Sequence, residues 1–293
     1  MNQKNWPWWR NNPIDLQQAR QHLREKLAQD GFETPGNTSL TLLKHTLNQP
    51  KSWLLSHGDY QLSPQENSTL QTSLNALLQG VPLPYVLGHW EFYGRTFQVT
   101  PDVLIPRPET ELLVEKAIKY AGRVLKPCII DVGTGSGAIA VSLAAELPRA
   151  TILGVDLSFN ALRVAQLNAQ RLCQSKIHFF QGDLLTPFRG PFDLICANLP
   201  YIPRNTLPNL AVSRWEPRLA LDGGESGLDA IRKLLKQAQT RLSPSGVILL
   251  ETESSLGPET LAAAQAVFPN AQHRLIQDLA SHDRLVEIHL NTS

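Results

Sequence analysis

Hydrophobic positions in the first 88 residues recur at the spacing of amphipathic helices. One apolar stripe follows Asp15, a residue type that caps helices, and Gly31 is placed to end that helix. A second start is marked at Ser63, where proline comes next and Glu66 stands three positions later, as in a capping box. Residues 1–88 are therefore predicted to form a small bundle of helices.

Residues 89–106 have a different pattern. The stretch 91–99 mixes aromatic and β-branched residues around Gly94, which is typical of a hairpin. Prolines then cluster at 106–108, directly before another helical pattern. We interpret residues 89–106 as a β-hairpin linker between two domains.

Beyond residue 106, short apolar runs alternate with helix-like segments. The runs occupy residues 128–132, 151–155, 177–180, 192–196 and 246–250. This rhythm is typical of βαβ units and predicts an α/β domain over 107–293, with a parallel sheet covered by helices on both faces. Two later runs, at 272–277 and 284–290, are joined by a polar stretch too short for a parallel crossover, which predicts an antiparallel strand at the end of the sheet.

Charge and residue counts narrow the functional classes. Among 293 residues, 27 Lys and Arg stand against 26 Asp and Glu, so the basic excess of nucleic-acid-binding domains is lacking and no direct contact with nucleic acid is expected. No apolar run approaches the roughly 18 residues of a membrane span, and the N-terminus lacks the pattern of a secretory signal. Three scattered cysteines indicate reduced thiols in the cytoplasm, and the eight histidines form no cluster that predicts a metal site.

The strongest local motif is a glycine loop at residues 133–137, between a predicted strand and a predicted helix. Its Gly-x-Gly-x-Gly spacing differs from the dinucleotide fingerprint, and no P-loop lysine follows. Asp156 ends the next strand, where a carboxylate can accept both hydroxyls of a ribose. Asp183 and Leu184 end the strand after that and are placed to contact an adenine. A site for a ribose and an adenine that lacks a motif for binding a diphosphate indicates S-adenosylmethionine. The alternative is that the glycines form only a tight turn and that Asp156 is a surface residue.

The tetrapeptide Asn-Leu-Pro-Tyr at 198–201 follows the fourth predicted strand. A planar amide or exocyclic amine is a poor nucleophile because its nitrogen lone pair is delocalised. The Asn198 side-chain oxygen and the Leu199 main-chain carbonyl could accept its two N–H bonds and localise that lone pair, while Pro200 stiffens the turn and Tyr201 offers a flat stacking face. We interpret Asn198 and Tyr201 as catalytic and expect no general base. The alternative is that residues 198–201 only connect a strand to the following loop and have no catalytic role.

These stretches resemble the HemK/PrmC group of methyltransferases. The matching segments are 80–88, 91–94, 105–111, the glycine loop, 198–201, 216–217 and 221–224. The resemblance implies an N-terminal domain of five helices, a hairpin linker and a seven-stranded Rossmann-like methyltransferase sheet. It also implies methylation of the glutamine side-chain nitrogen (N5) in the Gly-Gly-Gln motif of class 1 peptide-release factors, in the cytoplasm and by a monomer.

Site residues are also carried over by the resemblance. Together with the motifs above, the expected cofactor set is Gly133, Thr134, Gly135, Ser136, Gly137, Asp156, Asp183, Leu184 and Asn198. The expected substrate set is Asn198, Leu199, Pro200, Tyr201, Phe92 and Arg107. A structural ion pair of Arg107 with Glu109 or Glu111 is the alternative role for that arginine, and Glu216 is expected to be a polar loop residue.

Three departures from the family pattern stand out. Leu199 replaces the usual first proline of the tetrapeptide, residues 77–79 lack a basic pair, and Glu251-Thr252-Glu253 stands where the family has Glu-x-Gly. The main-chain carbonyl at 199 is retained despite the first change. We expect the tryptophans of the first nine residues, Trp6, Trp8 and Trp9, to form a loosely docked tail.

Two other functional classes fit parts of the sequence. An N6-adenine DNA or RNA methyltransferase uses the same kind of tetrapeptide to orient an exocyclic amine, but it needs a basic surface. A cofactor sensor or scaffold without turnover would keep the fold, but it would have no need of Asn198 and Tyr201. Methyl label found on release factor, on nucleic acid or on neither separates the three.

Overall fold

The computed structural model describes residues 14–173 and 177–291, and the chain divides into two compact units between Leu87 and Gly88. The predicted tail tryptophans lie outside the described residues. The helices of the first unit are α1 (Leu16–Gln29), α2 (Pro35–Leu47), α3 (Lys51–Ser56), α4 (Pro64–Leu78) and α5 (Leu83–Leu87). This confirms the predicted bundle of five helices for the described part of that unit.

Local capping explains where the two longest of these helices begin. The Asp15 carboxylate accepts a hydrogen bond from the Gln18 N–H at 2.8 Å at the start of α1. At the start of α4, the Ser63 N–H donates to the Glu66 carboxylate at 2.7 Å, and the Ser63 hydroxyl accepts from the Glu66 N–H. These bonds satisfy backbone donors that have no partner inside the helix. A core made almost entirely of leucine then holds the bundle together.

A two-stranded hairpin opens the second unit, with β1 (His89–Phe92) antiparallel to β2 (Arg95–Gln98). Its turn residues, Tyr93 and Gly94, both have positive φ, as a type I′ turn requires. The hairpin is fixed to the rest of this unit by hydrogen bonds: the Tyr93 N–H donates to Glu111 at 2.8 Å, and the Asn168 amide pairs with the Gln98 backbone.

The second unit contains a seven-stranded sheet in the order β5-β4-β3-β6-β7-β9-β8. Its strands are β3 (Cys128–Val132), β4 (Thr151–Asp156), β5 (Ile177–Gln181), β6 (Phe192–Ala197), β7 (Leu242–Glu251), β8 (Gln272–Gln277) and β9 (Asp283–His289). The predicted antiparallel strand is β9, which pairs with both β7 and β8. It lies one place in from the edge rather than at the edge, because the chain inserts β9 between β7 and β8.

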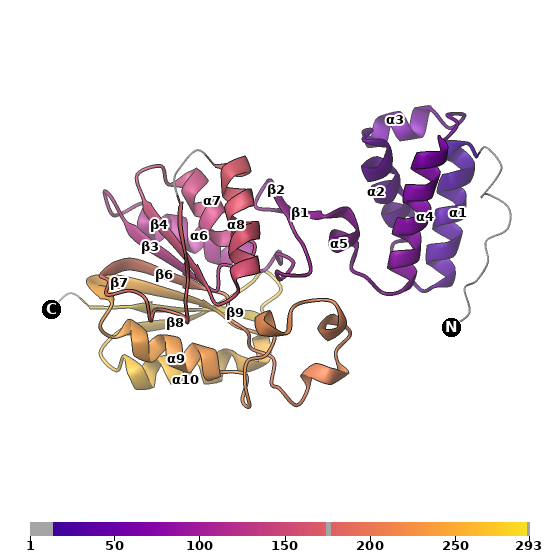
Figure 1. Cartoon of the computed structure of the whole chain (residues 1–293). Coiled ribbons are helices and arrows are strands. Elements are labelled where there is room, and N and C mark those ends of the chain that lie inside the picture. Colours follow the sequence, from indigo (N-terminus) through magenta and orange to yellow (C-terminus); the bar gives the residue numbers. More distant parts are fainter. Residues whose placement is uncertain (1–13, 174–176, 292–293) are drawn as a thin grey trace. The chain divides into compact units, whose positions relative to one another are not determined.

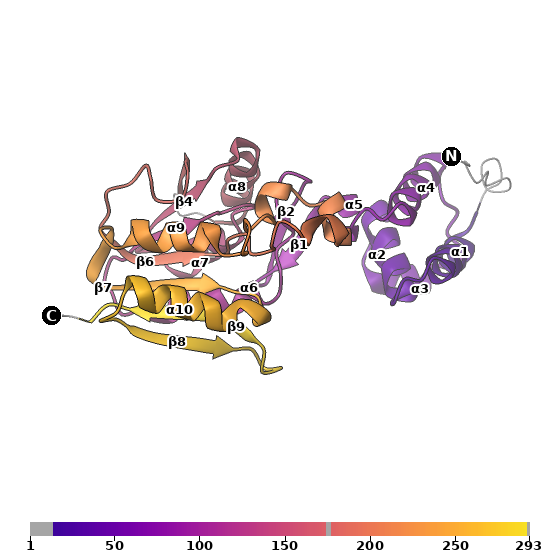
Figure 2. The same ribbon diagram turned by 90° about the horizontal axis from the view of Figure 1, so that it is seen from below.

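Helices cover both faces of the sheet, as Figures 1 and 2 show. One face carries α6 (Thr110–Ala121), α7 (Ala138–Glu146) and α8 (Phe159–Leu172), and the other carries α9 (Asp229–Ala238) and α10 (Gly257–Val267). Short 3-10 turns lie at Leu207–Asn209, Ala211–Arg214, Arg218–Ala220 and Ser254–Leu256. This arrangement confirms the predicted α/β architecture.

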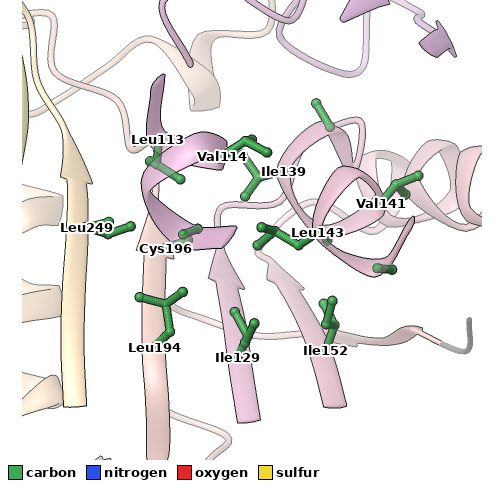
Figure 3. Packing of buried hydrophobic residues seen from close by; sticks show 14 of the residues in the cluster. Leu113, Val114, Ile129, Ile139, Val141, Leu143, Ile152, Leu194, Cys196 and Leu249 are labelled. Atoms are coloured by element: carbon green, nitrogen blue, oxygen red, sulfur yellow. The ribbon is translucent and has the colours of Figure 1, made fainter. Parts of the chain in front are cut away.

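Alternation along the strands separates the two cores. In β6, Leu194 and Cys196 face the core under α6 and α7 (Figure 3), whereas Ile195 and Ala197 belong to the core under α9 and α10. Successive side chains of a strand point to opposite faces. The next residue of the first series is therefore Asn198, which places its side chain on the α6 side.

Candidate active site

The site lies where the strand order reverses. The strand β3 has β4 on one side and β6 on the other, so the loops at its carboxyl end diverge and leave a crevice, the usual ligand site of open α/β sheets. A cavity of about 570 Å³ opens there. The predicted site residues that line it are Arg107, Gly133, Thr134, Gly135, Ser136, Asp156, Asp183, Leu184, Asn198, Leu199 and Pro200.

The glycine loop needs its glycines for two different reasons. All three have positive φ, of +74°, +55° and +79° for Gly133, Gly135 and Gly137. A Cβ at Gly135 would meet nothing closer than 3.9 Å and would project into the space beside the loop, whereas a Cβ at Gly137 would lie 3.1 Å from Ala165. Gly135 thus leaves room for a ligand, and Gly137 allows α7 and α8 to pack closely.

Asp131, at the end of β3, holds the glycine loop in place through hydrogen bonds. It is fully buried and accepts hydrogen bonds from the Thr134 hydroxyl at 2.6 Å and the Ala140 N–H at 3.2 Å. Burial raises the pKa of its carboxyl to about 7, against the lowering effect of those two bonds. Asp131 was not predicted as a site residue, although an acidic residue two positions before a glycine loop is a visible signal.

Asp156 is held with its carboxylate on the cavity wall. One oxygen accepts from the Gly135 N–H at 2.9 Å and the other from the Ser158 N–H at 2.8 Å. Burial raises the pKa of this carboxyl, and the backbone bonds act in the opposite direction. Each carboxylate oxygen can accept a further bond, so the pair can receive two neighbouring hydroxyls.

Asp183 and Leu184 follow β5 and line the next part of the cavity wall. The Asp183 carboxylate forms an ion pair with Lys233 of α9, and Leu184 has a positive φ of 53°. The apolar Leu184 side chain is partly buried against the core under α9. These residues thus present an apolar surface next to a charge pair.

The tetrapeptide at 198–201 places two acceptors beside the glycine loop. The Asn198 Nδ2 donates to the Thr110 Oγ1 at 3.1 Å. Among the described residues, no donor reaches the Asn198 Oδ1 or the Leu199 carbonyl oxygen. A Cβ at Gly133 would lie 3.0 Å from Leu199 Cδ2, so the buried Leu199 side chain packs directly against the loop. Both oxygens remain available to an incoming amide.

The Asp-Gly-Gly segment at 222–224 supports this tetrapeptide. The Ile202 N–H donates to the Leu221 carbonyl at 3.1 Å, and the Gly223 N–H donates back to the Ile202 carbonyl at 2.9 Å. A Cβ at Gly223 would lie 2.8 Å from the Tyr201 carbonyl carbon, and one at Gly227 only 2.4 Å from the Tyr201 oxygen. The glycines therefore let two backbone segments touch and fix the turn.

Arg107 has a partner other than the two that the sequence suggested. Its guanidinium pairs with Glu216, whose buried carboxylate also accepts from the Ile105 N–H at 3.3 Å. Glu109 instead lies 3.9 Å from Arg284, and Glu111 accepts from the hairpin. Glu216 is thus a buried ion-pair residue rather than a polar loop residue, and it ties the 105–107 segment to the loop after β6.

Two of the expected substrate residues are not in the cavity lining. Phe92 is 2% exposed and packs edge to face on Phe97, with ring centroids 5.9 Å apart, because its strand position turns it into the core under α6. The structure therefore does not bring Phe92 to the site. Tyr201 lies directly after the lining residues, and burial raises the pKa of its hydroxyl to about 12.

Sequence reasoning also missed Thr110 and Glu251. Thr110 is the first residue of α6, and Glu251 is the last of β7. Both are buried beside Asn198. Thr110 lies in the matching segment 105–111 and Glu251 stands where the family has Glu-x-Gly, but neither pattern indicated a role in the site. Thr252, one of the departures from the family pattern, is buried as well and lies 3.0 Å from the Thr260 hydroxyl.

Over 14–173 and 177–291, no group of three or more His, Cys, Asp or Glu side chains is arranged to hold a metal ion. In the same part of the chain, no helix combines the length and apolar character needed to cross a bilayer.

Comparisons with known proteins agree with this geometry. Residues 18–88 match the PrmC N-terminal domain, and residues 127–286 match a methyltransferase domain. The release factor glutamine methyltransferase of Moorella thermoacetica is 41% identical, covering 92% of this chain and 97% of its own length, and that of Bordetella pertussis is 38% identical, covering 90% and 97%. The hMettl16 catalytic domain, solved with a MAT2A 3'UTR hairpin, has the same fold at a TM-score of 0.50 and 15% identity, over 78% of this chain and 82% of that one.

Fold and site together define an S-adenosylmethionine-dependent methyltransferase. The crevice at the strand reversal, the open glycine loop and the acidic residue at the end of β4 are consistent with that class. The chain belongs to the release factor glutamine methyltransferase family.

Proposed function

We propose that this protein transfers the methyl group of S-adenosylmethionine to the side-chain amide nitrogen of the glutamine in the Gly-Gly-Gln motif of class 1 peptide-release factors. The observation that carries the proposal is the pair of unpaired acceptors, Asn198 Oδ1 and the Leu199 carbonyl, beside the cavity. A primary amide has two N–H groups in one plane, and two acceptors hold that plane fixed. The relatives are named release factor glutamine methyltransferases, and the glutamine side chain ends in such a primary amide.

The residues of the cavity fit S-adenosylmethionine. The space that a Cβ at Gly135 would fill can take the donor beside the loop backbone, and the Asp156 carboxylate can accept the ribose hydroxyls. Leu184 supplies an apolar surface for the adenine. When bound, the donor supplies an electrophilic methyl group on a sulfonium.

The protein itself orients the nucleophile. Asn198 Oδ1 and the Leu199 carbonyl accept the two amide N–H bonds. These bonds raise the electron density on the nitrogen, and the fixed plane directs its lone pair towards the methyl group. Tyr201, which directly follows the lining residues, would cover a face of the amide, and Arg107, paired with Glu216, borders the cavity. Alignment of this kind lowers a barrier by up to about 7–11 kcal/mol in ideal cases. The methylated nitrogen is strongly acidic, so water can take its proton without a basic side chain.

The two units would divide the work. In this proposal residues 1–88 recognise the protein substrate, 89–106 form the hairpin linker and 107–293 carry the chemistry, since all the site residues above lie in the second unit. The enzyme would act as a monomer in the cytoplasm, without direct contact to nucleic acid. Leu77 lies in the core of the bundle, so recognition must use other surfaces than the missing basic pair.

Labelled donor tests the proposal against its alternatives. The purified protein is incubated with methyl-labelled S-adenosylmethionine and, separately, release factor, DNA and ribosomal RNA. Label confined to a tryptic peptide that contains Gly-Gly-Gln is the expected result, and release factor with Asn in place of that glutamine is the control. Label on nucleic acid would favour an adenine methyltransferase, and label on none of the three would favour a cofactor sensor.

A further inference from the structure

The Asn198 side chain has two possible orientations, and only one suits an amide substrate. With Oδ1 towards the cavity it accepts an N–H of the substrate. With the amide flipped, its NH₂ would face the substrate NH₂, and two donors would oppose each other. The protein must therefore fix the flip state, and the residues behind Asn198 decide it.

Two buried side chains lie behind Asn198. Thr110 and Glu251 are 4% and 5% exposed. The strands β6 and β7 run parallel with Ala197 opposite Leu250, so the register leads on to Asn198 opposite Glu251. In that register both residues continue the series that faces α6, whose first residue is Thr110.

The chemistry of the Asn198 amide, the Thr110 hydroxyl and the Glu251 carboxyl decides which group donates and which accepts. Thr110 Oγ1 accepts from Asn198 Nδ2 at 3.1 Å, so its single proton is free for another acceptor. Among the described residues, the buried Glu251 Oε2 has no hydrogen-bond partner, and its carboxyl interacts electrostatically with both Thr110 and Asn198. An ionised carboxylate accepts only, which leaves the Asn198 NH₂ as the group that must point inward.

We propose that Glu251 is a positioning residue that acts with Thr110 to lock the Asn198 amide with its oxygen towards the substrate. This inference rests on the proposed function, because it names the group that orients the amide acceptor. Protonation of Glu251 would add a donor behind Asn198, which allows Thr110 to donate to Oδ1 and the amide to flip.

The surroundings of Glu251 raise its pKa, so that its carboxyl can be protonated near neutral pH. Burial raises the pKa of its carboxyl to about 7, and Glu109 at the start of α6 adds to the rise. Thr110, Arg284 of β9 and the Asn198 amide act in the other direction and lower the pKa. The Tyr201 hydroxyl, which also interacts with Glu251, stays neutral because its pKa is raised to about 12. The active form is ionised Glu251, so turnover should fall as pH falls through about 7.

Matched variants test the lock in the full-length protein. Glu251→Gln removes the carboxylate at equal size, Thr110→Val removes the hydroxyl, and Thr110→Ser restores it. Glu259→Gln, an exposed position on α10, is the control for the same chemical change. Measurements are kcat and KM for methyl transfer to release factor across pH, and the Kd of S-adenosylmethionine by calorimetry.

We expect Glu251→Gln and Thr110→Val to lower kcat by about 10²-fold, as a misplaced reactive group does, while the Kd of S-adenosylmethionine stays unchanged. Glu251→Gln should also abolish the acid limb of the kcat profile, and Thr110→Ser should restore kcat. A Glu251→Gln enzyme that keeps the parent kcat and the parent acid limb overturns the proposal. So does loss of activity in Thr110→Ser equal to that in Thr110→Val.

A spectroscopic measurement separates this inference from the proposed function. The Asn198 side-chain ¹⁵NH₂ signal, assigned by its loss in Asn198→Asp, should shift as pH passes through about 7 in the parent protein and stay constant in Glu251→Gln. A titrating signal without any methylation of release factor would retain the lock and reject the substrate. Methylation of release factor with an Asn198 signal insensitive to pH would reject the lock alone.

Discussion

Gly227→Ala offers a sharp test of how the tetrapeptide is held. Gly227 has a φ of +78°, and a Cβ there would lie 2.4 Å from the Tyr201 carbonyl oxygen and 3.2 Å from a Leu256 methyl carbon. An ordinary contact begins near 3.4 Å, so the Tyr201 carbonyl would have to move by about 1 Å. The tetrapeptide ends at that carbonyl, and the displacement passes to the two acceptors.

Two separate costs follow from this geometry. The left-handed backbone costs an alanine about 1–2 kcal/mol of stability wherever it occurs. A shift of about 1 Å at reacting groups costs about 10²-fold in rate. Gly94→Ala separates the two effects, since Gly94 has a φ of +67° and nothing within 4 Å of a Cβ.

The assay is single-turnover methyl transfer to release factor at saturating S-adenosylmethionine, with thermal unfolding followed by circular dichroism. We expect both variants to lose about 1–2 kcal/mol of stability and only Gly227→Ala to lose about 10²-fold in rate. Equal rates in the two folded variants would refute the idea that the 222–227 segment holds the substrate turn.

Other residues give independent predictions. Asp156→Ala should raise the Kd of S-adenosylmethionine by about 10- to 150-fold, because charged hydrogen bonds are worth about 1.5–3 kcal/mol; unchanged affinity by calorimetry would remove Asp156 from the site. Leu199→Pro should keep turnover within several-fold while it lowers stability by about 1–3 kcal/mol, because a buried leucine is lost but the carbonyl remains; an inactive but folded variant would assign residue 199 a further role. Asp131 binds a proton more tightly when folded, since its pKa rises from 3.8 to about 7, so the free energy of unfolding should rise as pH falls through about 7. Urea titrations of Asp131→Asn should show a smaller rise, and an identical pH dependence would contradict this role of burial.

Elements governed by neighbouring residues were predictable from the sequence. The predicted starts after Asp15 and Ser63 are real helix caps, and the hairpin turns at Gly94. Every predicted strand of the sheet is present, and all but β7 agree with the predicted bounds within one residue. The strand β7 begins at Leu242 rather than at 246. Period and capping depend on residues a few positions apart, so they can be read from the chain itself. The glycine loop and Asp156 were likewise predictable, because each directly follows or ends a predicted strand.

Contacts across the fold were not predictable in this way. Arg107 pairs with Glu216, at a separation of 109 positions, rather than with the acids nearby in sequence. Phe92 is buried in the core because of how the hairpin docks, and β9 lies inside the sheet because of the order in which strands pair. Each of these contacts joins segments far apart in the sequence, so it depends on how the whole domain packs.

The sequence by itself determined the elements, the glycine loop, the tetrapeptide and, through family resemblance, the reaction. Only the tertiary structure decided what surrounds Asn198: a threonine from the start of α6 and a glutamate from the end of β7. The local sequence indicated a role for neither residue, since a buried polar side chain acquires its role only from the partners that satisfy it. Sheet order and register bring these partners together, and both are properties of the whole domain.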